Sequence, residues 1–205
     1  MPLASGEGHR QNIRGRRSRE QLLDTAFYCI ATGGPEAVSA NLIAREAGVS
    51  WGRVNYQFGG TDGFWAALME YLEGKLGPFH PEIPDHPGIA ERVGAIIVHL
   101  WKAIDLPANR AVTNLRLGLP RKVDQLESTY PQTAAALASW DRRWNIDFTR
   151  AFDGLPVEQD KVRKVVAMLP GAMSGLRAEH SMVGYIDVEQ ARQGLAEVII
   201  AYLST

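Results

Sequence analysis

The fold of this 205-residue chain is decided by the stretch Asn41–Tyr56, which reads NLIAREAGVSWGRVNY. Its small, glycine, serine and aliphatic positions have the offsets that two helices need to cross at a tight turn. Ala44 is small where the helices would meet, and Gly48 can take the left-handed conformation that ends the first helix. Ser50 can then cap the second helix, and Val54 can anchor it from its inner face. The pattern predicts a helix-turn-helix; a plain helical hairpin in a protein core is the alternative.

The second helix of this pair carries polar and aromatic side chains on its outer face. These are Trp51, Arg53, Asn55 and Tyr56, close to the N-terminal end that would enter a DNA major groove. Arg53 is the best candidate for reading a base, because a guanidinium can pair with guanine through two hydrogen bonds. Trp51 has two interpretations: it packs on a thymine methyl group or a sugar, or it covers the domain's own core.

Apolar residues recur with helical spacing on both sides of this stretch. Upstream, Ser18 is placed to cap a helix over 18–32, and Gly33-Gly34-Pro35 would end that helix. Downstream, a helix is expected over 61–75. It is followed by 77–88, where four prolines and two glycines are incompatible with a helix interior. We interpret 77–88 as a linker.

The helical pattern continues beyond residue 88. The expected segments are 89–104, 108–117, 132–152, 157–183 and 188–203, with Pro170-Gly171 expected to kink the fourth of them. No run alternates apolar and polar residues as a half-buried strand does. The sequence therefore predicts an all-α fold of about nine helices in total, with an N-terminal three-helix helix-turn-helix domain and a C-terminal helical bundle.

Charge is distributed unevenly along the chain. The formal net charge is −1, from 22 basic and 23 acidic residues, which by itself argues against a nucleic-acid partner. Residues 1–60, however, contain seven arginines and five acidic residues, a net charge of +2. Five of those arginines lie between Arg10 and Arg19. They form a basic arm that can neutralise phosphates, the alternative being a solvated tail.

Composition excludes several classes of protein. With 45% hydrophobic and 22% charged residues, the chain has the composition of an ordinary globular protein rather than a disordered one. The single cysteine, Cys29, cannot form an internal disulfide, which favours a cytoplasmic location. No apolar run has the length of a signal peptide or a membrane-spanning helix, so we expect no membrane partner.

Enzyme motifs are missing or misplaced. The run GAMSG at 171–175 misses the nucleophile-elbow spacing by one residue and lies in a helical pattern. No two of the five histidines have the spacing that places two metal ligands on one helical face. The glycines at 59–63 lack the lysine of a phosphate loop. We therefore expect no enzyme activity, no cofactor and no bound metal.

The region from residue 19 to residue 64 resembles the TetR family of transcriptional regulators. The resemblance runs through REQLLDTAF at 19–27, LIA at 42–44, AGVS at 47–50 and VNYQFGGTDGF at 54–64. Two positions depart from the family pattern. Gln57 stands where histidine is common, and Thr61 stands where lysine is nearly standard and touches a phosphate. The resemblance thus implies a weaker phosphate clamp in this chain, offset by the arginine arm.

The resemblance implies a homodimeric, ligand-responsive DNA-binding regulator, with a repressor released by a small molecule as the expected type. Its partners would be double-stranded DNA with a palindromic operator, a small-molecule effector and a second copy bound through the last two helices. The implied DNA-binding residues are Arg17, Ser39, Asn41, Ser50, Trp51, Arg53, Asn55, Tyr56, Gln57 and Thr61. The alternative is a helical ligand-binding or interaction protein with weakened or lost operator binding.

The predicted division follows chain order: a flexible basic arm (1–17), a helix-turn-helix domain (18–76), the Pro-rich linker (77–88) and a ligand-binding and dimerisation domain (89–205). In the last domain, several aromatic and polar side chains cannot all be at the surface and are candidates for the effector site: Trp101, Arg116, Trp140, Trp144, Phe148 and His180. A mostly apolar pocket with a few polar anchors suits a small molecule, and Arg116 would favour an anionic one. Each aromatic residue also has an ordinary interpretation as part of the core.

Overall fold

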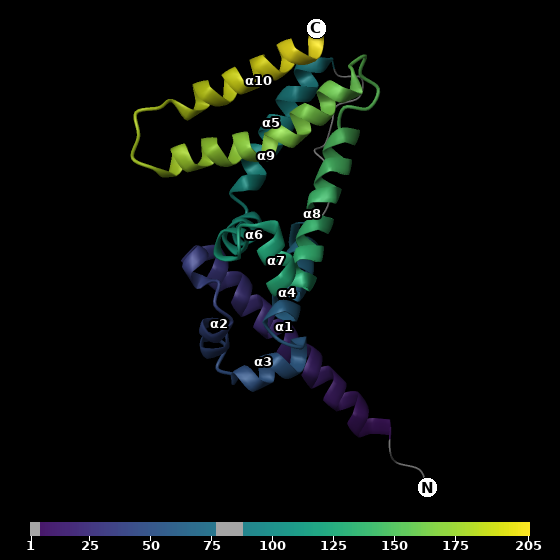
Figure 1. Ribbon diagram of the computed structural model, residues 1–205, viewed down its shortest axis with the longest axis vertical. Coiled ribbons are helices and arrows are strands. Elements are labelled where there is room, and N and C mark those ends of the chain that lie inside the picture. Colours follow the sequence, from purple (N-terminus) through teal and green to yellow (C-terminus); the bar gives the residue numbers. More distant parts are fainter. Residues whose placement is uncertain (1–4, 77–87) are drawn as a thin grey trace. The chain divides into compact units, whose positions relative to one another are not determined.

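The computed structural model describes residues 5–76 and 88–205, with side chains from Gly15 onward. The described residues form ten α-helices and no β-strand, which confirms the all-α prediction. The helices are α1 (Ser5–Gly33), α2 (Ala40–Glu46), α3 (Trp51–Phe58), α4 (Thr61–Leu76), α5 (Ile89–Ile104), α6 (Pro107–Gly118), α7 (Val123–Thr129), α8 (Pro131–Arg150), α9 (Gln159–Ser181) and α10 (Val188–Ser204), and a 3-10 turn, η1 (Pro35–Ala37), follows α1 (Figure 1). Apart from Gly88, the predicted linker lies outside the described residues, as do the first four residues of the predicted arm.

The chain forms two compact units. Unit 1 consists of the described residues up to Leu76 together with Pro107–Ala138, and unit 2 of those from Gly88 to Leu106 together with Ser139–Thr205. The sequence predicts 107–138 as part of the C-terminal domain, whereas α6 packs on α1, α4 and η1 in unit 1. Helix α8 contributes its first turns to unit 1 and the rest of its length to unit 2.

The core of unit 1 is built from helices with residues buried at four-residue spacing. Leu22, Ala26 and Ile30 are buried on α1, and Phe64, Leu68 and Leu72 are buried on α4. This spacing places each set on one helical face, and the two faces pack together with α6. The side chain of Asn114 on α6 donates a hydrogen bond of 2.8 Å to the carbonyl of Ile30. That bond fastens α6 to the C-terminal part of α1.

The start of α1 differs from the prediction. The helix begins at Ser5, so Ser18 lies inside it instead of capping it, and residues 5–17 of the predicted arm are helical. This segment contains no proline, and its arginines favour helix formation. Because 5–17 has no apolar stripe, periodicity gave no sign that the helix would extend there.

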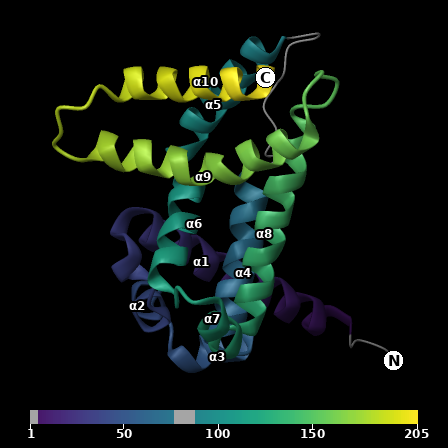
Figure 2. The ribbon, with the colours of Figure 1, turned by 45° about the horizontal axis from the view of Figure 1, so that its top comes forward.

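Unit 2 has a core of aliphatic and phenylalanine side chains from α5, α8, α9 and α10. Helices α9 and α10 lie side by side in both ribbon views (Figures 1 and 2). Helix α9 continues through Pro170, which has no N–H to donate to the carbonyl of Val166 one turn earlier. The indole Nε1 of Trp144 lies 3.5 Å from that carbonyl oxygen. Trp144 thus supplies a donor that the helix itself lacks.

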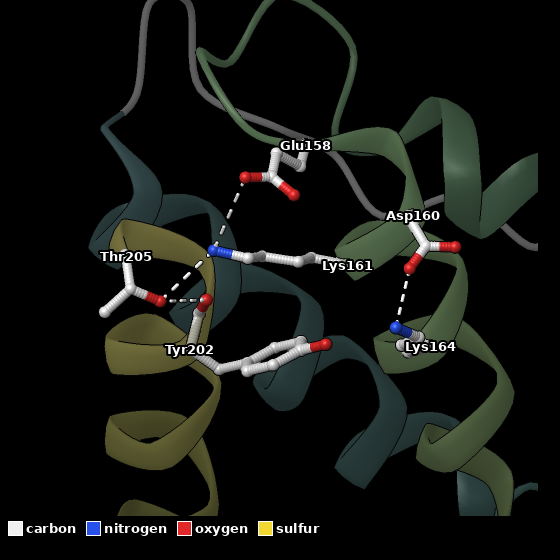
Figure 3. Close-up of polar contacts among 6 residues, drawn as sticks. All are labelled: Glu158, Asp160, Lys161, Lys164, Tyr202 and Thr205. Carbon is white, nitrogen blue, oxygen red and sulfur yellow. Dashed lines mark hydrogen bonds and ion pairs between the residues drawn. The ribbon is translucent and has the colours of Figure 1, made fainter.

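Lys161 joins the first turn of α9 to the last turn of α10 (Figure 3). Its ammonium group donates to the hydroxyl of Thr205 at 3.1 Å and lies 3.9 Å from the Glu158 carboxylate. The same group lies 5.7 Å from the centre of the Tyr202 ring. Beside it, Lys164 forms an ion pair of 2.6 Å with Asp160. The Lys161 contacts tie the start of α9 to the end of α10, whereas the Lys164–Asp160 pair lies within α9.

Candidate nucleic-acid interface

The residues predicted to make the helix-turn-helix adopt that geometry. The hydroxyl of Ser39 accepts a hydrogen bond of 3.3 Å from the backbone N–H of Leu42 and so caps α2. Gly48 has a φ of 66°, in the left-handed region where a side chain would be strained. Val54 of α3 is completely buried. Ser50 occupies the cap position of α3 in an extended conformation, but its hydroxyl makes no capping hydrogen bond.

The outer face of α3 presents the predicted DNA-contacting side chains to solvent. Arg53 and Asn55 are exposed, and Tyr56 is 91% exposed. Trp51 is 36% exposed, so part of its ring is covered and both interpretations of this residue stay open. On α2, Asn41 is exposed. An arginine, an asparagine and aromatic rings on one short helix suit direct contact with base edges and sugars.

Helix α1 contacts α3 through Ser18 and Arg19. The guanidinium of Arg53 donates to the hydroxyl of Ser18 at 3.0 Å. The guanidinium of Arg19 lies 4.7 Å from the centre of the Phe58 ring, at the distance of a cation–π contact. Arg17 is exposed on the same helix. Sequence reasoning missed the Ser18–Arg53 pair, because no local pattern links residues on two separate helices.

The backbone between α3 and α4 is tightly packed. Gly59 and Gly60 have φ values of 73° and 121°, both in the left-handed region. A Cβ on Gly63 would lie 1.9 Å from the carbonyl oxygen of Phe58, so no other residue fits there without movement of the backbone. Thr61 opens α4 and is half-buried. Gln57 has a buried amide oxygen with no hydrogen-bond partner among the described residues, although its role as a donor to DNA stays a prediction.

Two side chains in unit 1, Tyr71 and Cys29, have raised pKa values, and neither lies on the outer face of α3. Burial and the hydrogen bond to Asp24 raise the pKa of Tyr71 above its ordinary value, while Lys75 beside it opposes the shift. The Tyr71 hydroxyl donates to Asp24 and so ties α4 to α1. Burial and the nearby Glu46 carboxylate raise the pKa of the Cys29 thiol. A thiol held in its neutral form is a poor nucleophile.

The predicted effector residues divide between the two units. Arg116 lies on α6 in unit 1, and the other five lie in unit 2. Within unit 2, the Trp101 and His180 rings meet edge to face at 5.6 Å, and the Trp144 and Phe148 rings lie 4.0 Å apart. Phe148 is completely buried in the core, and Trp140 is 8% exposed.

An open groove of about 460 Å³ lies between α9 and α10. It is lined by small and aliphatic residues and one acid: Ala172, Gly175, Leu176, Glu179, Ala191, Gly194, Leu195 and Val198. None of the six predicted effector residues lines it. Among the described residues, no group of three or more His, Cys, Asp or Glu side chains is placed to hold a metal ion.

The two crossed helices with an outward polar face on the second define a helix-turn-helix DNA-binding domain. Residues 22–68 match the model of the family described as bacterial regulatory proteins, tetR family. The resemblance to the TetR family found in the sequence is therefore confirmed over this N-terminal domain.

Solved structures share the fold of this chain. A transcriptional regulator from Rhodococcus sp. Rha1 has a TM-score of 0.63 and 20% identity, with 90% of this chain and 95% of that chain covered. The multidrug binding protein EbrR, crystallised with imidazole, has a TM-score of 0.61 and 17% identity, with 90% and 94% covered. At such identities the likeness shows the fold, and with the family match it supports a DNA-binding transcriptional regulator. No curated protein matches the chain in sequence.

Every helix in the described part of the chain is too short or too polar to cross a membrane.

Proposed function

We propose that this protein is a homodimeric transcriptional repressor that a small molecule releases from a palindromic operator. The observation that carries the proposal is the outer face of α3, where Arg53, Asn55 and Tyr56 are exposed and Arg19 of α1 packs on Phe58. Because its proposed partner is DNA, we expect the repressor to act in the cytoplasm. Catalysis has no part in this function.

In the proposed complex, α3 enters the major groove. Arg53 pairs with a guanine, while Trp51 and Asn55 contact neighbouring base edges. The hydroxyl and amide side chains at the ends of α2, α3 and α4, together with one arginine of α1, position the domain on the phosphate backbone: Arg17, Ser39, Asn41, Ser50, Tyr56, Gln57 and Thr61. Since Thr61 is uncharged, the arginines of α1 supply most of the attraction to phosphates.

A second copy is proposed to bind across α9 and α10. Their groove is lined by small and aliphatic side chains, and Met168, Val198 and Tyr202 on the same helices are 43%, 65% and 39% exposed. Apolar surface of this extent on two neighbouring helices suits a helix-on-helix interface. A twofold dimer also places two recognition helices one DNA turn apart, about 34 Å, as a palindromic site requires.

The effector is proposed to bind in unit 2 near its aromatic side chains. Trp101 and His180 offer apolar ring faces and ring N–H groups, and Trp144 offers an apolar ring face. EbrR, which has a similar fold, is a multidrug binding protein. For Arg116, which lies in unit 1, the pairing with an anionic group stays a prediction. A ligand that binds one conformation of unit 2 more tightly would change DNA affinity by that difference in affinity.

Selection from a random-sequence duplex library tests the DNA-binding part. We expect a palindromic site to be enriched, with an affinity that falls steeply as salt rises. A transcriptional reporter behind that site should be silenced by the protein; activation would contradict the repressor role. Failure to enrich any sequence at low salt would favour the alternative, a helical ligand-binding protein without an operator, which the missing charge at Thr61 supports.

A further inference from the structure

Asp62, in the first turn of α4, caps a different helix. Its carboxylate accepts hydrogen bonds from the backbone N–H groups of Gln132 and Thr133, at 2.9 and 2.8 Å. The hydroxyl of Thr133 lies 2.8 Å from the same carboxylate and 3.1 Å from the carbonyl of Asp62. Three groups at the start of α8 therefore converge on one residue of α4.

This cap completes the hydrogen bonding at the start of α8. A helix leaves its first N–H groups without partners inside the helix. The first residue of α8 is Pro131, which has no N–H, and Asp62 takes the next two. The N–H of Ala134 bonds to the carbonyl of Tyr130, the residue just before the helix. Thr133 is completely buried, so loss of its partners would leave polar groups unpaired away from water.

The first turn of α4 also holds Thr61, a proposed phosphate contact. Asp62 directly follows Thr61, the proposed phosphate contact. Gly63 directly follows Asp62 and packs against the last carbonyl of α3 so closely that a Cβ would collide with it. This packing leaves the backbone little freedom to shift α4 without shifting the end of α3.

We propose that Asp62 is a positioning residue for DNA binding, through which α8 controls the start of α4. The proposal rests on the DNA-binding function above. Helix α8 continues to Arg150, and its later residues, among them Phe148, belong to the core of unit 2. Within unit 1, a shift of the first turn of α8 therefore acts on Asp62, and through it on Thr61 and the end of α3.

Asp62→Ala tests this role, with Asp187→Ala as the matched control. Asp187 also caps a helix, since its carboxylate accepts from the N–H of Gln190 at 3.0 Å at the start of α10. Both changes delete one carboxylate cap, but only Asp62 adjoins the DNA-contacting turn. We expect Asp62→Ala to weaken binding to the selected duplex on the order of tenfold, the size of one lost cap. Asp187→Ala should leave the affinity unchanged.

The direction of the change in DNA affinity distinguishes a loss of positioning from a loss of negative charge. Removal of a negative charge beside a phosphate contact would by itself strengthen DNA binding. Weaker binding by Asp62→Ala therefore reports lost positioning. Equal or tighter binding would overturn the proposal. Thr133→Val keeps the carboxylate and removes only the hydroxyl. It should weaken binding in the same direction by a smaller factor, and it serves if Asp62→Ala does not fold.

Hydrogen exchange tests the coupling without DNA. In the folded protein, Asp62→Ala should speed exchange at the N–H groups of Gln132 and Thr133. It should also speed exchange in the first turn of α4, where the N–H of Phe64 bonds to the carbonyl of Gly60 at 3.1 Å. Changes confined to α8 would overturn the coupling even if DNA is bound. If the wild-type protein enriches no duplex, the proposed function fails, and the exchange result still decides whether α8 and α4 are coupled.

Discussion

Single residues of the helix-turn-helix adopt the structural roles that the sequence pattern predicts where those roles depend on near neighbours in the chain. The cap at Ser39, the left-handed Gly48 and the buried Val54 were all predictable, because each role depends on neighbours within a few positions. Ser18 and Asp62 were not, because their partners lie on helices far away in the chain. Local geometry is readable from local sequence, whereas a hydrogen bond between helices requires the fold.

Arg53→Ala should weaken specific DNA binding by about 1–3 kcal/mol and relax the preference at one base pair, because a bidentate contact to guanine would be lost. Arg53→Lys should restore attraction to DNA but not the preference, since an ammonium group cannot form the paired contact. Arg45→Ala is the charge-matched control on α2, where Arg45 pairs with Glu46 at 3.5 Å on the surface. Quantitative binding to the selected site and its single-base variants measures these effects. An unchanged base preference in Arg53→Ala would remove Arg53 from this role.

Gly63→Ala and Gly74→Ala should have opposite effects on stability, although both lie in α4. An alanine at 63 collides with the Phe58 carbonyl oxygen, whereas at 74 nothing lies within 4 Å of the added Cβ. Gly74→Ala should therefore stabilise the protein by up to about 1 kcal/mol, through helix propensity alone. Gly63→Ala should destabilise it by about 1–3 kcal/mol, as overpacking does. Urea unfolding measures both, and a stabilising Gly63→Ala would show that the turn can relax.

The predicted bounds of a helix match the structure where the helix buries an apolar stripe. They fail where it has no such stripe. Helices α4 and α5 begin and end close to the predicted limits, because their apolar residues recur with helical spacing. Helix α7 was missed, since it has no buried residue and therefore no stripe. The early start of α1 was missed for the same reason. Amphipathic periodicity detects packing rather than helix formation as such.

The contact between α4 and α1 through Tyr71 should weaken at alkaline pH. Its pKa is raised in the folded protein, so the stability that its hydroxyl contributes is fully present below the unfolded-state pKa of about 10 and is lost as pH rises through the higher folded value. At neutral pH, Tyr71→Phe should lower the free energy of unfolding by about 1 kcal/mol or less.

The difference between wild type and Tyr71→Phe should shrink as pH rises past this range, as followed by urea unfolding at successive pH values. Tyr28→Phe is the control, since Tyr28 also lies on unit 1 but is 70% exposed. A difference independent of pH would mean that the hydroxyl does not stabilise the α1–α4 contact through its protonated form.

At the scale of the whole molecule, the sequence indicates only part of the division into two compact units. The N-terminal family match and the helical C-terminal half were predictable from motif and period. The membership of 107–138 was not, because Ala108, Ala111 and Leu115 make an ordinary apolar stripe that does not say which core it joins. The same limit applies to the effector site, where Arg116 carries the chemistry of a ligand anchor but lies in unit 1.

Val198→Arg should turn the proposed dimer into a monomer. Val198 is 65% exposed and lines the α9–α10 groove, so a second copy would have to bury an unpaired guanidinium. Gln193→Arg adds the same charge to α10 at an exposed position outside the groove and should leave the dimer intact. Light scattering at micromolar concentration distinguishes the two states. A wild-type monomer, or a Val198→Arg dimer, would exclude this face as the interface.

The placement of the tryptophans gives the protein built-in optical reporters. Trp101 in unit 2 has the His180 ring at 5.6 Å and the Arg192 guanidinium at 5.9 Å, so any molecule that displaces either neighbour changes the surroundings of its indole. Trp51, on the outer face of α3, would lose contact with water on a nucleic acid. Two single-tryptophan versions, one keeping Trp101 and the other Trp51, would let fluorescence follow effector and DNA in separate samples, without any attached dye.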